Sequence, residues 1–164
     1  MTTRTRWAAL ATAALALITA ACGASSSDGR ACGPIVREAL DPAYLVHVIG
    51  DRADVSYTSD PPTSGPHQAA PAIIGAATKT LPRPVQVGIL ERGDIVIQYS
   101  PSLPASEQRA LEALASDHVV IAPNPDLPTT VVATAWTAKR SCGTVDVPSL
   151  QEFIAERGGK GPES

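Results

Sequence analysis

Three cysteines, at positions 22, 32 and 142, constrain this chain of 164 residues more than any other feature. Cys22 ends a segment in which Arg4 and Arg6 precede an uncharged apolar run over residues 7–21. This order of a basic region and a short apolar region is typical of an export signal. The run is shorter than the roughly 20 residues that cross a bilayer as a helix. We therefore expect an exported protein whose leader is removed.

The residues around Cys22 predict the kind of signal. Residues 18–23 read ITAACG, with two small residues directly before the cysteine, as in sites cut by a lipoprotein signal peptidase. An ordinary secretory signal with an incidental cysteine is the alternative. Residues 23–29 are small and polar, which suits a flexible tether. We predict a signal peptide at 1–21, acylation (palmitate) at Cys22, a tether at 22–31 and attachment to the outer face of the membrane.

Once Cys22 carries lipid, Cys32 and Cys142 are an even pair in an oxidising compartment, and we expect a disulfide between them. Two free buried thiols are the alternative. Loss of the leader removes two arginines and moves the formal charge from −3 to −5. A mildly acidic chain without a basic patch has no means to hold a phosphate backbone, so we exclude nucleic acid as a partner.

The rest of the chain predicts one α+β domain over residues 32–158 with a frayed tail at 159–164. Short strands are expected at 44–49, 54–57, 119–121 and 130–137, and residues 34–40 predict a helical turn. The β-branched runs 85–90 and 95–99 flank a glycine-containing turn and predict a β-hairpin. Residues 104–116 and 146–158 predict two amphipathic helices, the second capped by Asp146. Two such helices on one face of a mostly antiparallel sheet would bury their apolar stripes.

The proline-rich loop over residues 58–84 contains the least generic stretch, PPTSGPH at 61–67. A loop of this length in a small domain is expected to be ordered and functional. Ser64 stands three residues before His67, so the two could be considered as the nucleophile and base of a hydrolase. The chain, however, has no Gly-x-Ser-x-Gly turn of the kind that presents such a serine. We therefore expect no enzymatic activity. A structural role for His67, hydrogen-bonded to the backbone of a neighbouring strand, is an alternative to a binding role.

Read in order, several short pieces resemble the bacterial domain of unknown function 3105 family, which occurs in secreted or membrane-attached proteins. The resemblance covers residues 32–163 and is carried by His47-Val48, Tyr57, PPTSGPH, Leu90-Glu91-Arg92-Gly93, Val96-Ile97-Gln98-Tyr99, Thr134-Ala135-Trp136, Phe153-Ile154 and Gly161-Pro162-Glu163. The family brings no established activity with it.

The resemblance also implies a degenerate metal site. Similar proteins carry two histidines in a pattern like V-H-S-L-E-H-G, where this chain has Gly88 and Arg92. His47, His67 and Glu91 remain as potential ligands for copper or zinc. A guanidinium at Arg92 repels a nearby cation and suits an anion or carboxylate instead.

The sequence therefore suggests two alternative functions. The first is a non-enzymatic, lipid-anchored module without a cofactor that binds a small ligand or an envelope protein. It would use the loop at 58–84 and the hairpin turn, with Ser64, His67 and Arg92 as contacts. The alternative is a copper- or zinc-binding protein using His47, His67 and Glu91.

Overall fold

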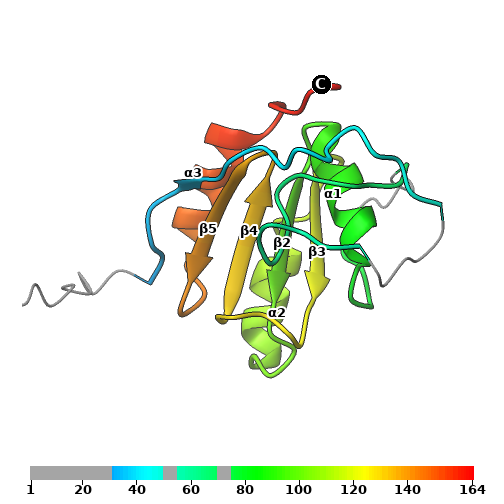
Figure 1. Ribbon diagram of the computed structural model, residues 1–164. Helices are drawn as coiled ribbons and strands as arrows, with labels where there is room; N and C mark the ends of the chain where they lie inside the picture. Colours follow the sequence, from blue (N-terminus) through cyan, green and yellow to red (C-terminus); the bar gives the residue numbers. More distant parts are fainter. Residues whose placement is uncertain (1–30, 50–54, 70–74) are drawn as a thin grey trace, which may run out of the picture.

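The computed structural model describes residues 31–49, 55–69 and 75–164. The predicted signal peptide, Cys22 and all but the last residue of the predicted tether lie outside these residues. The described residues form eight elements, which Figure 1 labels in chain order except for the short β1: β1 Val36–Arg37, α1 Arg83–Glu91, β2 Ile95–Tyr99, α2 Ala105–Glu112, β3 Val119–Pro123, β4 Val131–Ala135, β5 Ala138–Cys142 and α3 Val147–Arg157. None of the helices in this part of the chain is long and apolar enough to span a membrane.

The strands of the described residues form one sheet in the order β1-β5-β4-β2-β3. β2 and β3 run parallel and α2 connects them, whereas the other neighbouring strands are antiparallel. Ile97 in the middle of β2 lies opposite Ile121 on one side and Ala133 on the other. The predicted α+β class with a mostly antiparallel sheet is confirmed.

The two faces of the sheet bury different side chains of β2. Ile95, Ile97 and Tyr99 belong to a core with Leu111 of α2 and with Leu150 and Phe153 of α3. Val96 points to the opposite face, where it packs in a second core with Val85 and Ile89 of α1. The two predicted amphipathic helices do cover one face, and α1 covers the other (Figure 1).

The run Val85 to Leu90 was wrongly predicted as a strand, since it lies in the helix α1. Residues 84–90 are all buried, so the polar face by which a helix is recognised is missing. The alternation of Val85, Val87 and Ile89 then imitates a strand. Pro84 in the first turn, where a helix tolerates proline, is the local signal that favours the helix.

The hairpin of this fold occurs later in the chain than predicted. β4 and β5 pair antiparallel around Trp136 and Thr137, and Thr137 adopts a φ of 53°. We had predicted one continuous strand over 130–137. Threonine rarely takes a positive φ, so the presence of Thr137 in the sequence does not indicate a turn at this point.

The N-terminal predictions need similar correction. Residues 34–40 contain the edge strand β1 in place of a helical turn, and residues 44–49 contribute a single bridge, His47 to His67. Residues 55–57 form no strand, and Asp54 lies outside the described residues.

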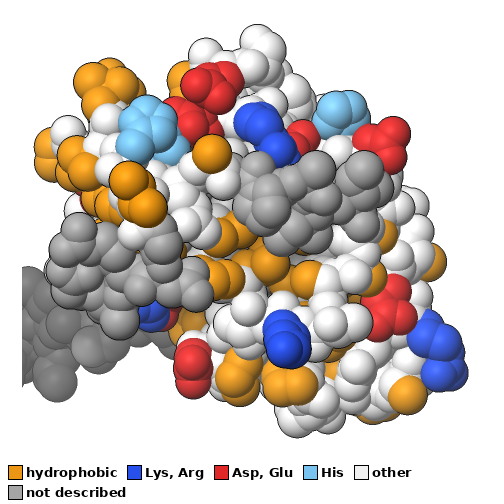
Figure 2. Space-filling view, turned by 90° about the vertical axis from the view of Figure 1, so that its right-hand side faces the viewer, with side chains coloured by type: hydrophobic (Ala, Val, Ile, Leu, Met, Phe, Trp, Pro, Cys, Tyr) orange, Lys and Arg blue, Asp and Glu red, His pale blue; other side chains and the backbone are white. Residues whose placement is uncertain are grey.

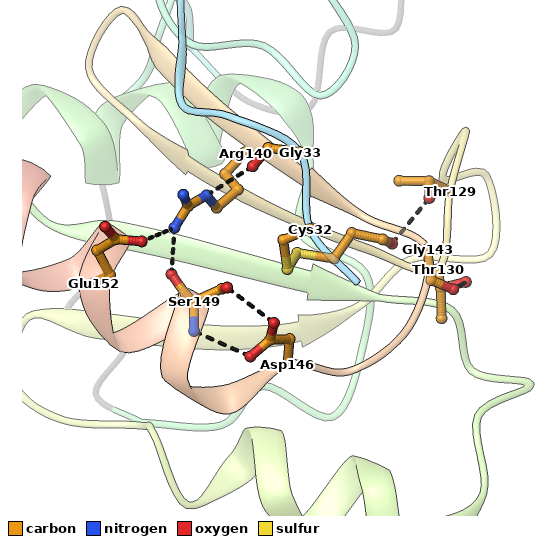
Figure 3. The surroundings of a disulfide bond; sticks show 10 residues. Cys32, Gly33, Thr129, Thr130, Arg140, Gly143, Asp146, Ser149 and Glu152 are labelled. Atoms are coloured by element: carbon orange, nitrogen blue, oxygen red, sulfur yellow. Dashed lines mark hydrogen bonds and ion pairs between the residues drawn. A yellow bond between two sulfur atoms is a disulfide. The ribbon is translucent and has the colours of Figure 1, made fainter. Parts of the chain in front are cut away.

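The predicted disulfide between Cys32 and Cys142 is present and buried (Figure 3). Around it, the amide of Gly33 donates to the carbonyl of Ser141 at 2.9 Å, and Nε of Arg140 donates to the carbonyl of Gly33 at 3.0 Å. A second guanidinium nitrogen of Arg140 donates to the carbonyl of Ser149 at 2.7 Å. The N-terminal arm, β5 and α3 are thereby joined at one end of the sheet.

The PPTSGPH segment is buried at each of its seven residues, 61–67. Glu38 of the N-terminal arm accepts hydrogen bonds from Ser59 at 2.6 Å and Thr63 at 2.7 Å and pairs with Lys139 of β5 at 3.1 Å. Burial raises the pKa of Glu38, but these hydrogen bonds and the lysine charge outweigh it and leave the pKa below its ordinary value. The carboxylate thus holds the segment against the arm and the sheet.

Candidate metal centre

The backbone turn before His67 sets the position of its imidazole. Gly65 has a φ of 123°, and a Cβ at this position would lie 3.1 Å from the Tyr57 ring and 3.3 Å from the Asp41 carboxyl group. The position therefore requires glycine. The hydroxyl of Tyr57 donates to the carbonyl of Pro66 at 2.8 Å, which fixes the residue directly before the histidine.

The imidazole of His67 is fully buried, and its Nδ1 lies 3.1 Å from the carbonyl oxygen of Gly65. A carbonyl oxygen only accepts, so this contact is a hydrogen bond when Nδ1 carries the hydrogen. In the neutral ring, Nε2 then presents its lone pair. This is the arrangement by which proteins orient a histidine that binds a metal through its other nitrogen.

Two side chains from other parts of the chain meet Nε2 of His67. Oε2 of Glu91, the last residue of α1, lies 2.8 Å away, and Nε2 of His47 lies 3.3 Å away. The amide of Val48 donates to the carbonyl of His67 at 2.7 Å, and the amide of His67 donates to the carbonyl of Val46 at 3.0 Å. These bonds hold the His47 segment against the buried loop.

The ligand atoms of His47, His67 and Glu91 all lie within 4.8 Å of one another. When the hydrogen of neutral His67 is on Nδ1, as in the bond to Gly65, its Nε2 lone pair and the ionised carboxylate of Glu91 both accept hydrogen bonds and repel each other at 2.8 Å. A cation between them, either a second proton on His67 or a metal ion, removes this repulsion. Zinc–nitrogen and zinc–oxygen bonds of about 2.0–2.2 Å fit three ligands at this spacing after small side-chain shifts.

The site is open to solvent on the His47 side. His67 is buried and Glu91 half-buried, whereas His47 is exposed. Its neighbours are also exposed: Leu45 at 70%, Val46 at 48% and Ile49 at 95%. Hydrophobic side chains gather around a histidine at one edge of the face in Figure 2. Among the three candidate ligands, His47 is therefore the one that solvent reaches most freely.

The structure places the remaining predicted contacts elsewhere. Ser64 is 3% exposed, and its hydroxyl accepts the amide hydrogen of Asp41 at 2.9 Å, a structural role within the loop. Arg92 caps α1 and donates to Asp94 at 2.9 and 3.2 Å. The carboxylate that we expected Arg92 to bind therefore belongs to this chain.

The sequence reasoning missed Asp94 and His118. Asp94 is 7% exposed, and its second oxygen lies 2.9 Å from Nδ1 of the exposed His118. Asp94 thus joins Arg92 to His118, the third histidine of the chain. Because 24 residues separate Asp94 from His118, no local pattern pointed to this pair.

A family described as "Protein of unknown function (DUF3105)" matches residues 48–164. The chain belongs to this family. No curated protein and no solved structure matches it. The matched region contains His67 and Glu91, whereas His47 directly precedes it.

The helix α1 brings together positions 88 and 92, at which the resemblance described above implies histidines. In the hairpin that we predicted, positions 91 and 92 would lie in the turn after the strand over 85–90. On a helix, positions 88, 91 and 92 have i, i+3 and i+4 spacing and share one face. Histidines in place of Gly88 and Arg92 would therefore stand beside Glu91.

The C-terminal tail of this DUF3105 chain was predicted to be frayed, but it packs against the end of α1. The amide of Gly159 donates to the carbonyl of Gly93 at 2.9 Å, and the amide of Glu163 donates to the carbonyl of Glu91 at 3.1 Å. A Cβ on Gly161 would overlap the carbonyl oxygen of Glu91 and the amide nitrogen of Gly93. The tail therefore supports the backbone that carries one ligand of the candidate site.

Proposed function

We propose that this protein is a non-enzymatic, lipid-anchored envelope protein that binds a divalent transition metal, zinc or copper(II), through His47, His67 and Glu91. The observation that carries the proposal is the convergence of two imidazoles and a carboxylate from three separate segments within 4.8 Å. Among the two functions suggested by the sequence, the geometry favours metal binding, since Ser64 and Arg92 have partners within the chain.

The ligand types favour zinc and copper(II) over other ions. Imidazole suits zinc and copper, whereas copper(I) prefers the thiolates and thioethers that are missing from this set. Calcium and magnesium prefer a shell made of oxygen atoms, and only Glu91 provides one. Three protein ligands leave a fourth position for water or another molecule, as in open zinc sites.

The exposure of His47 favours an exchangeable ion over a permanently buried one. His67 and Glu91 lie on parts of the chain that are packed in the domain, and His47 approaches them from the outside. Binding the metal would join the exposed segment to the buried loop. Such a site suits a protein that takes up an ion and passes it on.

The test is metal binding by the purified, oxidised protein without a histidine tag. We expect about one equivalent of zinc or copper(II) by calorimetry and elemental analysis. His47→Ala removes an exposed ligand and should leave folding intact while weakening affinity by more than about 100-fold. His67→Ala should do the same, although this residue is buried and its variant needs a separate test of folding.

His118→Ala is the matched control, since it makes the same change at an exposed histidine outside the site. It should keep the stoichiometry and affinity of the unmodified protein. The proposal fails if the protein binds no stoichiometric metal. It also fails if His118→Ala weakens binding as much as His47→Ala does.

The envelope location rests on the signal at residues 1–22. We expect membrane fractions to contain the protein with a diacylated residue at Cys22, and Cys22→Ala to abolish acylation and membrane retention. Mass spectrometry of the mature N-terminus provides the measurement. Cys32→Ala, the control, should leave acylation unchanged. An unacylated N-terminus in the unmodified protein would refute lipid anchoring without affecting the metal test.

A further inference from the structure

A cavity of about 440 Å³ lies at the other end of α1 from the metal ligands, near its first turn. Its volume is in the range of small-molecule sites. The walls come from the loops before α1, the first turn of α1 and the turn after β3. The lining residues are Val55, Tyr57, Asp60, Thr80, Leu81, Pro82, Arg83, Pro84, Gln86, Asn124 and Asp126.

The floor of this cavity contains two buried amides whose orientation is set by a chain of hydrogen bonds. Nε2 of Gln86 donates to the carbonyl of Leu81 at 2.7 Å, and its Oε1 accepts from Nε2 of Gln98 at 3.0 Å. Oε1 of Gln98 in turn accepts from Nδ2 of Asn124 at 2.8 Å. The Leu81 carbonyl can only accept a hydrogen bond, so it determines which way the Gln86 amide is turned. The orientations of the Gln98 and Asn124 side-chain amides follow in turn.

This series of hydrogen bonds leaves N–H donors that a ligand can use. An amide nitrogen carries two hydrogens, and the bonds above use one each on Gln86 and Asn124. Their oxygens are already engaged, since Oδ1 of Asn124 accepts the amide hydrogen of Asp126 at 3.0 Å. The floor therefore offers N–H groups, which match the oxygen atoms of a ligand.

The walls of the cavity contain an aromatic ring, and their charges disfavour an anion as the ligand. Arg83 forms a two-point ion pair with Asp60 at 2.9 and 3.2 Å, which neutralises both. Asp126 leaves the lining with a negative charge, so phosphates and carboxylates are disfavoured. Burial raises the pKa of Tyr57 to about 12, so this ring stays neutral, and its hydroxyl is engaged by Pro66.

We propose that this cavity binds a neutral saccharide unit. A sugar ring presents hydroxyl and carbonyl oxygens at its edge and C–H groups on its face. The edge matches the N–H groups of Gln86 and Asn124, the hydroxyl of Thr80 and the carboxylate of Asp126. The face matches the ring of Tyr57 and the apolar side chains of Val55 and Leu81. This site does not depend on metal binding.

Thr80→Trp is designed to fill the cavity without disturbing the amide chain. Thr80 is an exposed residue of the lining, and its neighbour Lys79 is also exposed but does not line the cavity. Lys79→Trp is therefore the matched control. The probes are the neutral disaccharides of N-acetylglucosamine, cellobiose and maltose, and the readout is NMR of the oxidised protein with ¹⁵N-labelled side-chain amides.

We expect at least one disaccharide to shift the side-chain amide signals of Gln86 and Asn124 in a saturable manner. Thr80→Trp should weaken this binding at least tenfold, and Lys79→Trp should leave it unchanged. The proposal is overturned if none of the disaccharides binds. It is also overturned if binding survives Thr80→Trp, or if phenethylamine, a cationic probe with an aromatic ring, occupies the cavity where the sugars do not.

Discussion

Removal of the disulfide by Cys32→Ala and Cys142→Ala together is expected to lower the free energy of unfolding by about 4–5 kcal/mol. The two cysteines are 110 residues apart in the sequence, so the bond restricts most of the unfolded domain. A domain of this size has a total stability of about 5–15 kcal/mol, so the loss is a large part of it. Chemical denaturation under oxidising conditions measures the difference.

Reduction of the unmodified protein provides an independent form of the same experiment. A thiol reductant should lower its stability to that of the double variant and should not affect the variant itself. Cys22→Ala is the control, because this residue lies outside the cross-link and its loss should leave stability unchanged. A change below about 1 kcal/mol on reduction would contradict the expected role of the bond.

Gly161→Ala is expected to detach the C-terminal tail from α1. The added methyl group would overlap the Glu91 carbonyl oxygen and the Gly93 amide nitrogen, and its contact with the Glu91 carbonyl carbon would be 2.8 Å. These are backbone atoms of a helix end, so the tail has to move. It then loses the hydrogen bonds made by the amides of Gly159 and Glu163, at a cost of about 1–3 kcal/mol.

Hydrogen exchange of the Glu163 amide and denaturant unfolding report this change separately. Gly143→Ala is the matched control, since the nearest heavy atom to its added Cβ would be 4.0 Å away. This control should stay within about 0.5 kcal/mol of the unmodified protein. If Gly161→Ala is equally stable and its Glu163 amide remains protected, the tail contact is not tight.

The candidate site could be predicted only in part. His47, His67 and Glu91 were singled out through the resemblance to DUF3105 proteins, and the fold brings them together. The sequence analysis placed Glu91 in the turn of a predicted hairpin, whereas Glu91 is the last residue of the helix α1 and shares one of its faces with position 88. The partner of Arg92 was missed because Asp94 was read as part of a turn.

Local chemistry and the number of cysteines determine several features from the sequence alone. Asp146 accepts from the amide of Ser149 at 3.2 Å as the predicted cap of α3, since a cap needs only neighbours in sequence. The pairing of Cys32 with Cys142 followed from parity, once export and the separate use of Cys22 were assumed.

Tertiary structure decided the rest. The segment at 84–90 is buried on all sides, which erases the periodicity that separates helix from strand. Thr137 lies in the turn of the β4–β5 hairpin with a positive φ, a backbone conformation that threonine rarely adopts. The meeting of His47, His67 and Glu91, and the alignment of the Gln86, Gln98 and Asn124 amides, depend on contacts between distant residues. Such contacts are set by packing of the whole domain, and no short stretch of sequence encodes them.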